Sequence, residues 1–350
     1  MNMKRILISI LFSLLNCLAI AQDPSFSLFY NNPTYYNPAM NAINKGLTFR
    51  ANARNQWSEI PGKFNTYSFS FDGEITPYFA MGLNLVSDVA GEGLFRTSGG
   101  KISLSQCFQR EKHILQFGMS TAFMNKSIDW SRLTFSDQYD EVLGKIYNSS
   151  FIPPDNNSYN YVDLGAGIAY QFFYDRKTTG FFKKMMFNVG MSMNHLNQPK
   201  DAYFSGNDFI PLKTIIHTRN QLLLGRNVYS FSGIYEIQKE FETRTFGFDF
   251  LTMQKITFGL WNRSGRTING QRFESFISTF GFILPIKNIN FVRVNYAIDF
   301  TITKLRTASF GSQEISLVYI LDDTYILKKL HERNKKKNMF KCPADFKGFR

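Results

Sequence analysis

From residue 46 onward, apolar and polar side chains alternate with a period of two in one segment after another. In residues 65–73 aromatic side chains alternate with hydroxyl side chains, and in residues 46–57 apolar side chains alternate with polar and charged ones. Successive side chains of a β-strand point to opposite faces, so each segment has one apolar and one polar face. This repeated pattern predicts an all-β chain that closes into a transmembrane antiparallel β-barrel, with lipid outside and water inside.

The alternation predicts about fourteen strands, at residues 46–57, 65–73, 78–88, 97–108, 112–123, 159–174, 184–195, 215–224, 228–237, 243–251, 256–263, 272–284, 290–302 and 312–320. Numbered in order, the odd connections include the longest, Met124–Ser158 and Leu196–Thr214, whereas the even ones are mostly short. Outer-membrane barrels have long outer loops, short periplasmic turns and both termini in the periplasm. The sorting therefore supports the strand count and predicts an outer-membrane location.

A soluble β-sandwich also alternates and is the alternative fold. Strands of about ten residues are longer than the five or six typical of soluble sheets, which favours the membrane barrel. The mean hydropathy of −0.21 suits a barrel, because half of each strand is polar. On the polar faces, the charges of Arg50, Arg54, Asp72 and Asp88 are expected to point into the lumen.

The first 21 residues have the features of a cleavable export signal. Lys4 and Arg5 precede an apolar run at residues 6–18, and Ala19 and Ala21 are the small residues expected before a cleavage site. The mature chain should then begin at Gln22. A lipoprotein signal ending at Cys17 is the alternative, although Asn16 fits poorly before it.

The mature chain divides into three parts. Residues 22–45 are irregular and rich in proline and asparagine, which predicts a plug or lid packed in the lumen by Tyr30, Tyr35 and Tyr36. Residues 46–320 form the expected barrel. Residues 321–350 form a tail. The alternation of long outer and short periplasmic connections places this tail in the periplasm, and it is basic from Lys328 to Arg350. This tail is either solvated chain or a docking segment.

Composition and motifs give no sign of an enzyme. The chain carries a net charge of +13, concentrated in the tail, without an aromatic and basic motif for nucleic acid. It has no catalytic or phosphate-binding motif and no zinc motif, so we expect no cofactor and no metal. Asp137 and Asp140 offer too few oxygen ligands for calcium and should belong to a polar network in an outer loop. Cys107 and Cys342 could pair in an oxidising periplasm.

Several stretches together resemble one family. They are NNP at 31–33, NPAM at 37–40, RNQW at 54–57, IPGKFNTYSFSFD at 60–72, VSDVAGEG at 86–93, IDWSRLTFSDQYD at 128–140, DLGAGIAY at 163–170, NHLNQPKDAYF at 194–204, LWNR at 260–263, NYAIDFTITKL at 295–305, SQEISLVY at 312–319 and CPADF at 342–346. In this order they resemble the PorP/SprF family of type IX secretion system outer-membrane proteins of Bacteroidetes.

The resemblance implies a non-enzymatic role in secreting proteins and anchoring them at the cell surface. Its implied partners are the periplasmic ring components of the secretion system, a surface adhesin or other cargo with a C-terminal sorting domain, and outer-membrane lipid. Some members of the family serve gliding motility, and the sequence does not assign this chain to a subgroup.

Two surfaces are the candidates for these contacts. Aromatic side chains in the outer loops are expected to hold the cargo, namely Phe151, Tyr203 and Phe204. The basic tail is expected to meet the periplasmic ring through Lys335, Lys336, Lys337 and Phe346. The alternative function is transport of small hydrophobic molecules, because a similar NPA signature occurs in barrels of the long-chain fatty-acid transporter type.

Overall fold

The computed structural model describes residues 23–321, except 45, 60–61, 77, 92–93, 141, 154–156, 176–181, 202–207, 268–269, 287–289 and 303–308. The predicted signal peptide and all but the first residue of the predicted tail lie outside the described residues.

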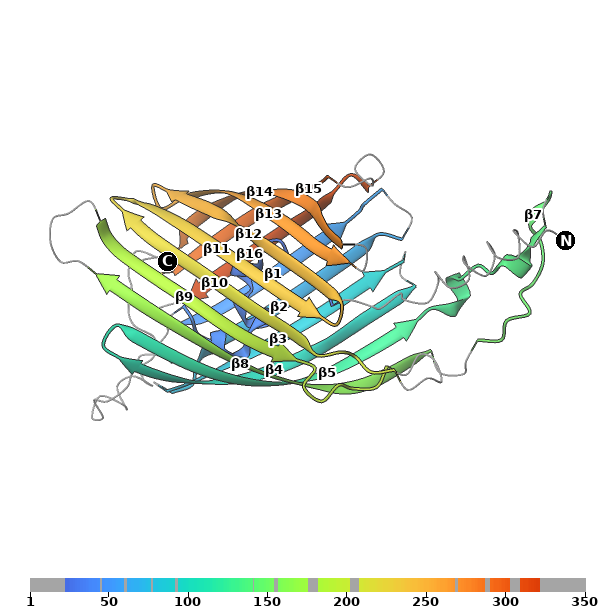
Figure 1. Cartoon of the computed structure of the whole chain (residues 1–350), viewed down its shortest axis with the longest axis horizontal. Coiled ribbons are helices and arrows are strands. Elements are labelled where there is room, and N and C mark those ends of the chain that lie inside the picture. The colour runs from blue at the N-terminus through green and yellow to red at the C-terminus, as the bar shows by residue number, and fades with distance from the viewer. Residues whose placement is uncertain are drawn as a thin grey trace.

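Fourteen antiparallel strands form a closed barrel (Figure 1). Each strand pairs with its neighbours in the chain, and the first strand pairs with the last to close the ring. The strands are β1 (Leu47–Gln56), β2 (Phe64–Glu74), β3 (Phe79–Ala90), β4 (Phe95–Arg110), β5 (His113–Ile128), β8 (Ser158–Asp175), β9 (Phe182–Asn194), β10 (Lys213–Leu224), β11 (Asn227–Gln238), β12 (Phe241–Thr252), β13 (Ile256–Thr267), β14 (Gly270–Ile286), β15 (Asn290–Thr301) and β16 (Ser312–Leu321). The predicted barrel and its strand count are confirmed.

The alternation of the sequence becomes the two faces of the wall. On β2, the Phe69 side chain is 43% exposed on the outer face, whereas the neighbouring Ser68 is 4% exposed and faces the lumen. The outer face of the barrel repeats this pattern with Phe, Leu, Ile, Met and Tyr side chains. Such an apolar outer band suits contact with lipid. No helix among the described residues is long and apolar enough to cross a membrane.

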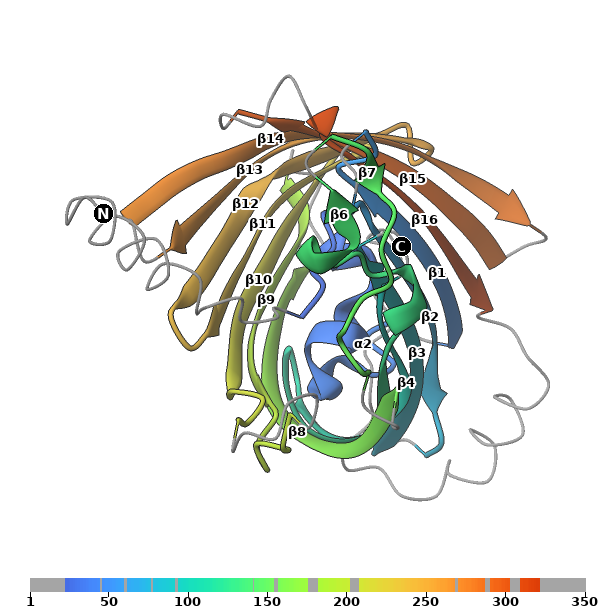
Figure 2. The same cartoon turned by 90° about the vertical axis from the view of Figure 1, so that its right-hand side faces the viewer.

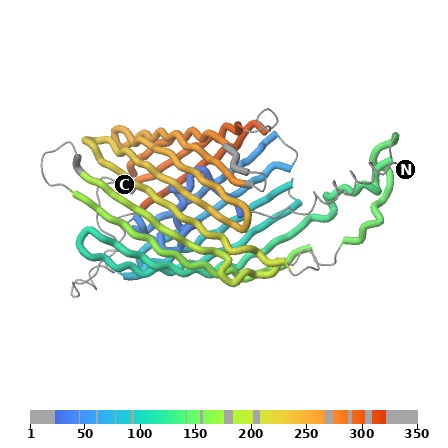
Figure 3. Tube along the Cα trace, in the orientation of Figure 1, coloured from blue at the N-terminus to red at the C-terminus, as the bar shows by residue number. Residues whose placement is uncertain are grey.

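The two ends of the barrel differ. One end carries the segments 129–157 and 195–212, and the other carries turns such as 111–112 and 225–226. The 129–157 segment projects well beyond the barrel (Figure 3) and contains the 3₁₀ turns η3 (Trp130–Arg132) and η4 (Ser136–Gln138) and the short strands β6 (Tyr139–Asp140) and β7 (Gly144–Lys145). We call these the loop end and the turn end, and assign them to the cell exterior and the periplasm by the general rule for outer-membrane barrels.

The N-terminal segment, residues 23–44, lies inside the ring of strands (Figure 2). It contains η1 (Phe29–Asn31), the single-turn helix α2 (Pro33–Tyr36) and η2 (Pro38–Met40). Pro33 and Pro38 each begin a helical turn, where a missing N–H costs no hydrogen bond. Short turns of this kind let the segment fill a lumen that a regular helix or strand would not match.

We expect Phe69→Arg to impair the assembly of the barrel. An arginine that faces lipid near the middle of the membrane costs about 2–4 kcal/mol. The yield of heat-modifiable barrel in the membrane fraction should fall, and Phe69→Leu, which keeps the site apolar, should leave it unchanged. Equal yields for both variants would contradict the assignment of this face. Ser68→Arg is unsuitable as a control, because Ser68 Oγ accepts a hydrogen bond from Asn32 of the N-terminal segment at 3.0 Å.

Candidate functional site

The N-terminal segment runs through the lumen from the loop end to the turn end. Asp23 contacts His195, which directly follows β9 at the loop end. Ala42 donates its N–H to Asp72 Oδ2 at 2.7 Å, and β1 then begins at the turn end. Residues 23–44 therefore cross the barrel before the first strand begins.

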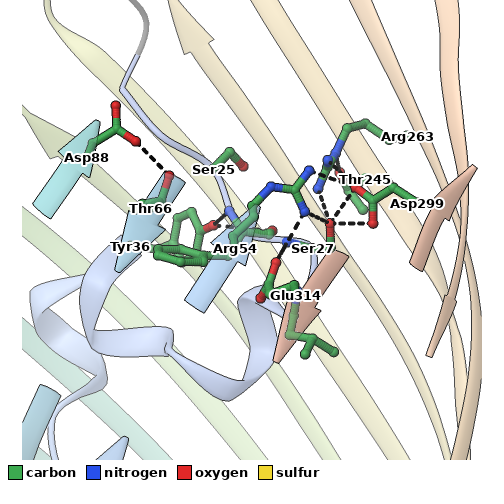
Figure 4. A network of polar contacts seen from close by, with 12 residues as sticks. Ser25, Ser27, Tyr36, Arg54, Thr66, Asp88, Thr245, Arg263, Asp299 and Glu314 are labelled. Carbon is green, nitrogen blue, oxygen red and sulfur yellow. Dashed lines mark hydrogen bonds and ion pairs between the residues drawn. The ribbon is translucent and has the colours of Figure 1, made fainter. Parts of the chain in front are cut away.

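A cluster of four charged wall residues holds the segment at Ser27 (Figure 4). Arg54 pairs with Asp299 at 2.7 Å and with Glu314 at 3.3 Å, and Arg263 pairs with Asp299 at 3.0 Å. The Ser27 hydroxyl lies among them and donates to Asp299 while it accepts from both guanidinium groups.

The backbone of the segment completes the cluster. Glu314 accepts the N–H of Ser27 at 2.6 Å and the N–H of Leu28 at 3.1 Å. All four wall residues are buried, and a buried charge is costly unless it is paired and hydrogen-bonded. The cluster therefore fixes the segment through charge-assisted hydrogen bonds.

A second polar contact fastens the start of the segment at the loop end. Asp23 Oδ2 lies 2.8 Å from His195 Nε2 and 3.8 Å from Lys213 Nζ, and His195 Nδ1 lies 3.0 Å from Asp163. Burial alone would lower the pKa of His195, but the two carboxylates outweigh it and raise the pKa to about 9. Burial alone would raise the pKa of Asp23, whereas His195 and Lys213 hold it below its usual value. The imidazolium and the carboxylate thus stabilise one another.

The three tyrosines predicted to fill the lumen all lie in this segment and contact the wall or its own backbone. Tyr30 stacks on Trp261 with ring centroids 5.0 Å apart, and the Arg219 guanidinium lies 4.5 Å from the centroid of the Tyr30 ring. Tyr35 lies under Lys101, and its hydroxyl donates to the Pro24 carbonyl at 2.8 Å. The Tyr36 hydroxyl accepts the Phe26 N–H at 2.7 Å.

Trp261 was missed as a lumen residue, although the sequence contains a signal for it. It is 1% exposed and contacts both Tyr30 and Phe29. On β13 it occupies the same phase of the alternation as the inward-facing Arg263, whereas Phe258 and Leu260 face outward. Following the phase along this strand would have placed Trp261 inside.

The Asn37-Pro38-Ala39 turn packs against glycines of the wall. Asn37 donates through Nδ2 to the backbone carbonyls of Ile168 and Met191 at 3.1 and 3.3 Å. Gly118 and Gly167 face each other on β5 and β8 beneath this turn. A methyl group on Gly118 would overlap the backbone of Pro38 and Ala39, and one on Gly167 would overlap the Asn37 side chain. The missing side chains thus make room for the turn.

A cavity of about 130 Å³ remains between the segment and the wall. Three arginines line it, Arg50, Arg219 and Arg293, together with apolar side chains such as Phe173 and Ile320 near the turn end. Its lining contains no aspartate or glutamate among the described residues.

The outer 129–157 loop forms a compact tip. Phe151 packs against Phe135 and Trp130, with ring centroids 4.6 and 5.6 Å apart, and remains partly exposed. Asp137 accepts hydrogen bonds from Ser149 and Ser150, which lower its pKa, so this carboxylate belongs to a polar network within the loop. The other predicted contact residues lie outside the described residues. They are Tyr203 and Phe204 in the outer loop and Lys335, Lys336, Lys337 and Phe346 in the tail.

Metal-ligating side chains do not gather at one place in the described part of the chain. It contains no group of three or more histidine, cysteine, aspartate or glutamate side chains that could hold a metal ion. Cys107 is disulfide-bonded, and Cys342, with which a pairing was predicted, lies outside the described residues.

The closed barrel with its apolar outer band defines this chain as an outer-membrane barrel protein. The family model described as the type IX secretion system membrane protein PorP/SprF matches residues 19–319. The chain therefore belongs to the PorP/SprF family, which is a family of secretion-system membrane barrels and not of enzymes. No curated protein matches it in sequence.

Solved structures with a similar fold are distant. The toluene transporter TodX of P. putida is 9% identical, with 84% of this chain and 95% of that chain covered and a TM-score of 0.41. A FadL homologue of Pseudomonas aeruginosa is 12% identical, with coverage of 82% and 92% and a TM-score of 0.40. CdiB from Acinetobacter baumannii is 9% identical at a TM-score of 0.39, and the chain spans 60% of its length. These likenesses bear on neither the ligand nor the function of this chain.

We expect Gly118→Ala to loosen the N-terminal segment without breaking the barrel. The added methyl group overlaps the backbone of Pro38 and Ala39, and overpacking of this kind costs about 1–3 kcal/mol. The urea midpoint of the purified protein should fall and its conductance in planar bilayers should rise.

Gly233→Ala is the matched control, because it also adds a methyl group to a strand glycine. There the nearest atom is Phe246 Cβ at 3.6 Å, an ordinary contact. If both variants behave like the original chain, the close packing of the segment on Gly118 does not restrict the lumen.

The contact between His195 and Asp23 should make stability depend on pH. The pKa of His195 is raised from 6.5 to about 9, so its contribution is fully present below about pH 6.5 and is lost as the pH rises through 9. At most it is worth about 3 kcal/mol. The difference in urea midpoint between the original chain and His195→Asn should be large at pH 6 and small at pH 10. A difference that stays constant with pH would contradict the charged pair.

Proposed function

We propose that this chain is a non-enzymatic component of the type IX secretion system that holds a secreted protein at the cell surface and contacts the periplasmic ring. In this proposal the 129–157 loop binds the cargo, an adhesin or another protein with a C-terminal sorting domain. The tail, with Lys335, Lys336, Lys337 and Phe346, binds the ring components. Membership of the PorP/SprF family supports the general role, and the loop supports the assignment of the cargo surface.

The observation that carries the proposal is the exposed apolar surface of the outer loop. Val142 and Ile152 are 88% and 87% exposed, and Leu143, Ile146 and Tyr147 are also exposed. The loop lies beyond the ends of the strands, so these side chains are not part of the wall (Figure 1). A cluster of large apolar side chains on a loop that is held by a rigid scaffold is typical of a protein-binding surface.

The filled lumen supports a holding role over a conducting one. Residues 23–44 run along the lumen and are bound to the wall at the loop end, in the middle and at the turn end. A polypeptide cannot share this space unless the segment leaves it. Contacts on the loop and on the tail need no such movement.

Transport of small hydrophobic molecules is the second candidate function. The cavity favours it, because part of its lining is apolar, including Phe173, Met186 and Ile234. The two functions differ in what they bind, so capture of a secretion partner by the purified barrel supports the first, and uptake of a hydrophobic molecule by cells supports the second.

We expect separate losses when the two surfaces are changed. The triple variant Val142→Ser, Leu143→Ser and Ile152→Ser should release surface cargo from the purified barrel and keep the ring components. Truncation after Tyr325 should release the ring components and keep the cargo. Both sets of partners are measured by co-purification from membranes and mass spectrometry.

The double variant Lys145→Ser and Asn148→Ser is the matched control in the same loop, because it alters exposed polar side chains and leaves the apolar surface intact. It should keep both sets of partners. If the triple variant also keeps its cargo at the level of this control, the loop does not bind the cargo and that part of the proposal fails.

A further inference from the structure

Arg293 on β15 is a cationic side chain in the wall of the cavity that has no ion-pair partner among the described residues. None of the described residues makes a hydrogen bond or an ion pair with it, and its Nε is buried without a partner. The guanidinium of arginine remains charged in proteins, and a buried charge is costly unless it is paired. An unpaired ionisable group inside a membrane barrel is a typical sign of a functional site.

The two other arginines of the cavity differ from Arg293 because each has its own carboxylate. Arg50 pairs with Asp72, and Arg219 pairs with Asp249 at 3.0 Å. Neither carboxylate lines the cavity. Asp249 pairs with Arg219 and acts on Arg293 only from a longer distance, so this one carboxylate serves two guanidinium groups and leaves an excess of positive charge at Arg293.

The register of the strands puts two of these arginines in one row. Val318 on β16 lies opposite Arg50 on β1 and opposite Arg293 on β15. Neighbouring strands are about 4.8 Å apart, so the two guanidinium groups start from backbone positions about 10 Å apart. Of the two, only Arg293 lacks an ion-pair partner of its own, because Arg50 is paired with Asp72.

Next to this charged row, the turn end of the lumen is apolar. One row nearer the turn end, Phe291 on β15 lies opposite Ile320 on β16, and both side chains are buried. They belong to a hydrophobic cluster that contains Leu223, Val228, Leu251, Ile283, Phe291, Val318 and Ile320. We call this cluster the apolar collar. Val318 and Ile320 of the collar line the cavity, so a molecule at Arg293 has apolar side chains toward the turn end.

We propose that this cavity binds a small anionic amphiphile, whose carboxylate or phosphate head bonds Arg293 and whose apolar body lies along the apolar collar. Arginine suits such a head, because its planar fork can donate two parallel hydrogen bonds. A cavity needs about 10–15 Å³ to hold one water molecule, so the cavity of about 130 Å³ accommodates a head group and a short apolar body. Free carboxylates and lipid phosphates share the chemistry of the head.

Octanoate is the probe, and octanol is its neutral counterpart of the same length. Binding to the purified full chain in detergent is measured by calorimetry. Octanoate should bind, and octanol should bind at least tenfold more weakly. Equal binding of the two would overturn the proposal, because the head would then contribute nothing.

Inorganic phosphate should bind more weakly than octanoate, and equal binding would overturn the role of the apolar body. Octyl phosphate separates the two sources of the head, because tighter binding than octanoate favours a lipid phosphate.

Arg293→Gln removes the charge and should weaken octanoate binding at least tenfold. Arg266→Gln is the matched control. The Arg266 side chain is 60% exposed and lies near the loop end of β13, whereas the apolar collar lies at the turn end. It should bind octanoate like the original chain. Heat-modified gel migration shows that each variant is folded.

Arg293→Lys keeps the positive charge but loses the planar fork of donors. This variant tests the same contact if Arg293→Gln does not fold. We expect about tenfold weaker binding of octanoate, and unchanged binding would overturn the assignment of the head to Arg293. Co-purification of cargo and ring components should be unchanged in both variants, so failure here is distinguishable from failure of the proposed secretion role.

Discussion

The contact of Ser27 with Arg54, Arg263, Asp299 and Glu314 is the interaction on which the arrangement of the lumen depends. The four charges come from β1, β13, β15 and β16, which are brought together only when the barrel closes. The segment in turn needs the charges, because Glu314 satisfies two of its backbone N–H groups. Removing one partner of a buried charge network leaves another charge unpaired at a cost of several kcal/mol. Closure of the wall and placement of the segment therefore stabilise one another.

The middle of the segment is held by shape. Around Asn37, the wall offers glycines where other strands carry side chains, and the turn bonds directly to strand carbonyls. Carbonyl oxygens that already belong to a strand ladder can accept a second hydrogen bond, because each has two lone pairs. The NPA sequence thus has a structural explanation in this chain, namely the fit of a tight turn onto a smooth part of the wall.

The wall could be predicted from the sequence because a strand has a short and regular period. On β2 the alternation alone assigned Phe69 to the outside and Ser68 to the inside, and it also assigned Arg50, Arg54 and Asp72 to the lumen, where they are buried. The path of residues 23–44 could not be predicted in this way. Its contacts join residues more than 200 positions apart, such as Ser27 with Glu314, and no local pattern reports such pairs. The exposed apolar tip at Val142 was missed for a similar reason, since single apolar residues in a loop have no period.

The direction of the segment constrains how this barrel can form. Asp23 lies at the loop end and β1 begins at the turn end, so the chain crosses the lumen once before the first strand starts. A finished barrel would have to be threaded by this segment, against buried contacts along its whole length. A barrel that closes around the segment meets no such barrier, and the strands β1 and β16, whose pairing closes the ring, carry Arg54 and Glu314. The two strands that close the barrel thus also carry residues that bind Ser27. A barrel that closed without the segment would bury the charges of Arg54 and Glu314 without the hydrogen bonds that the segment provides.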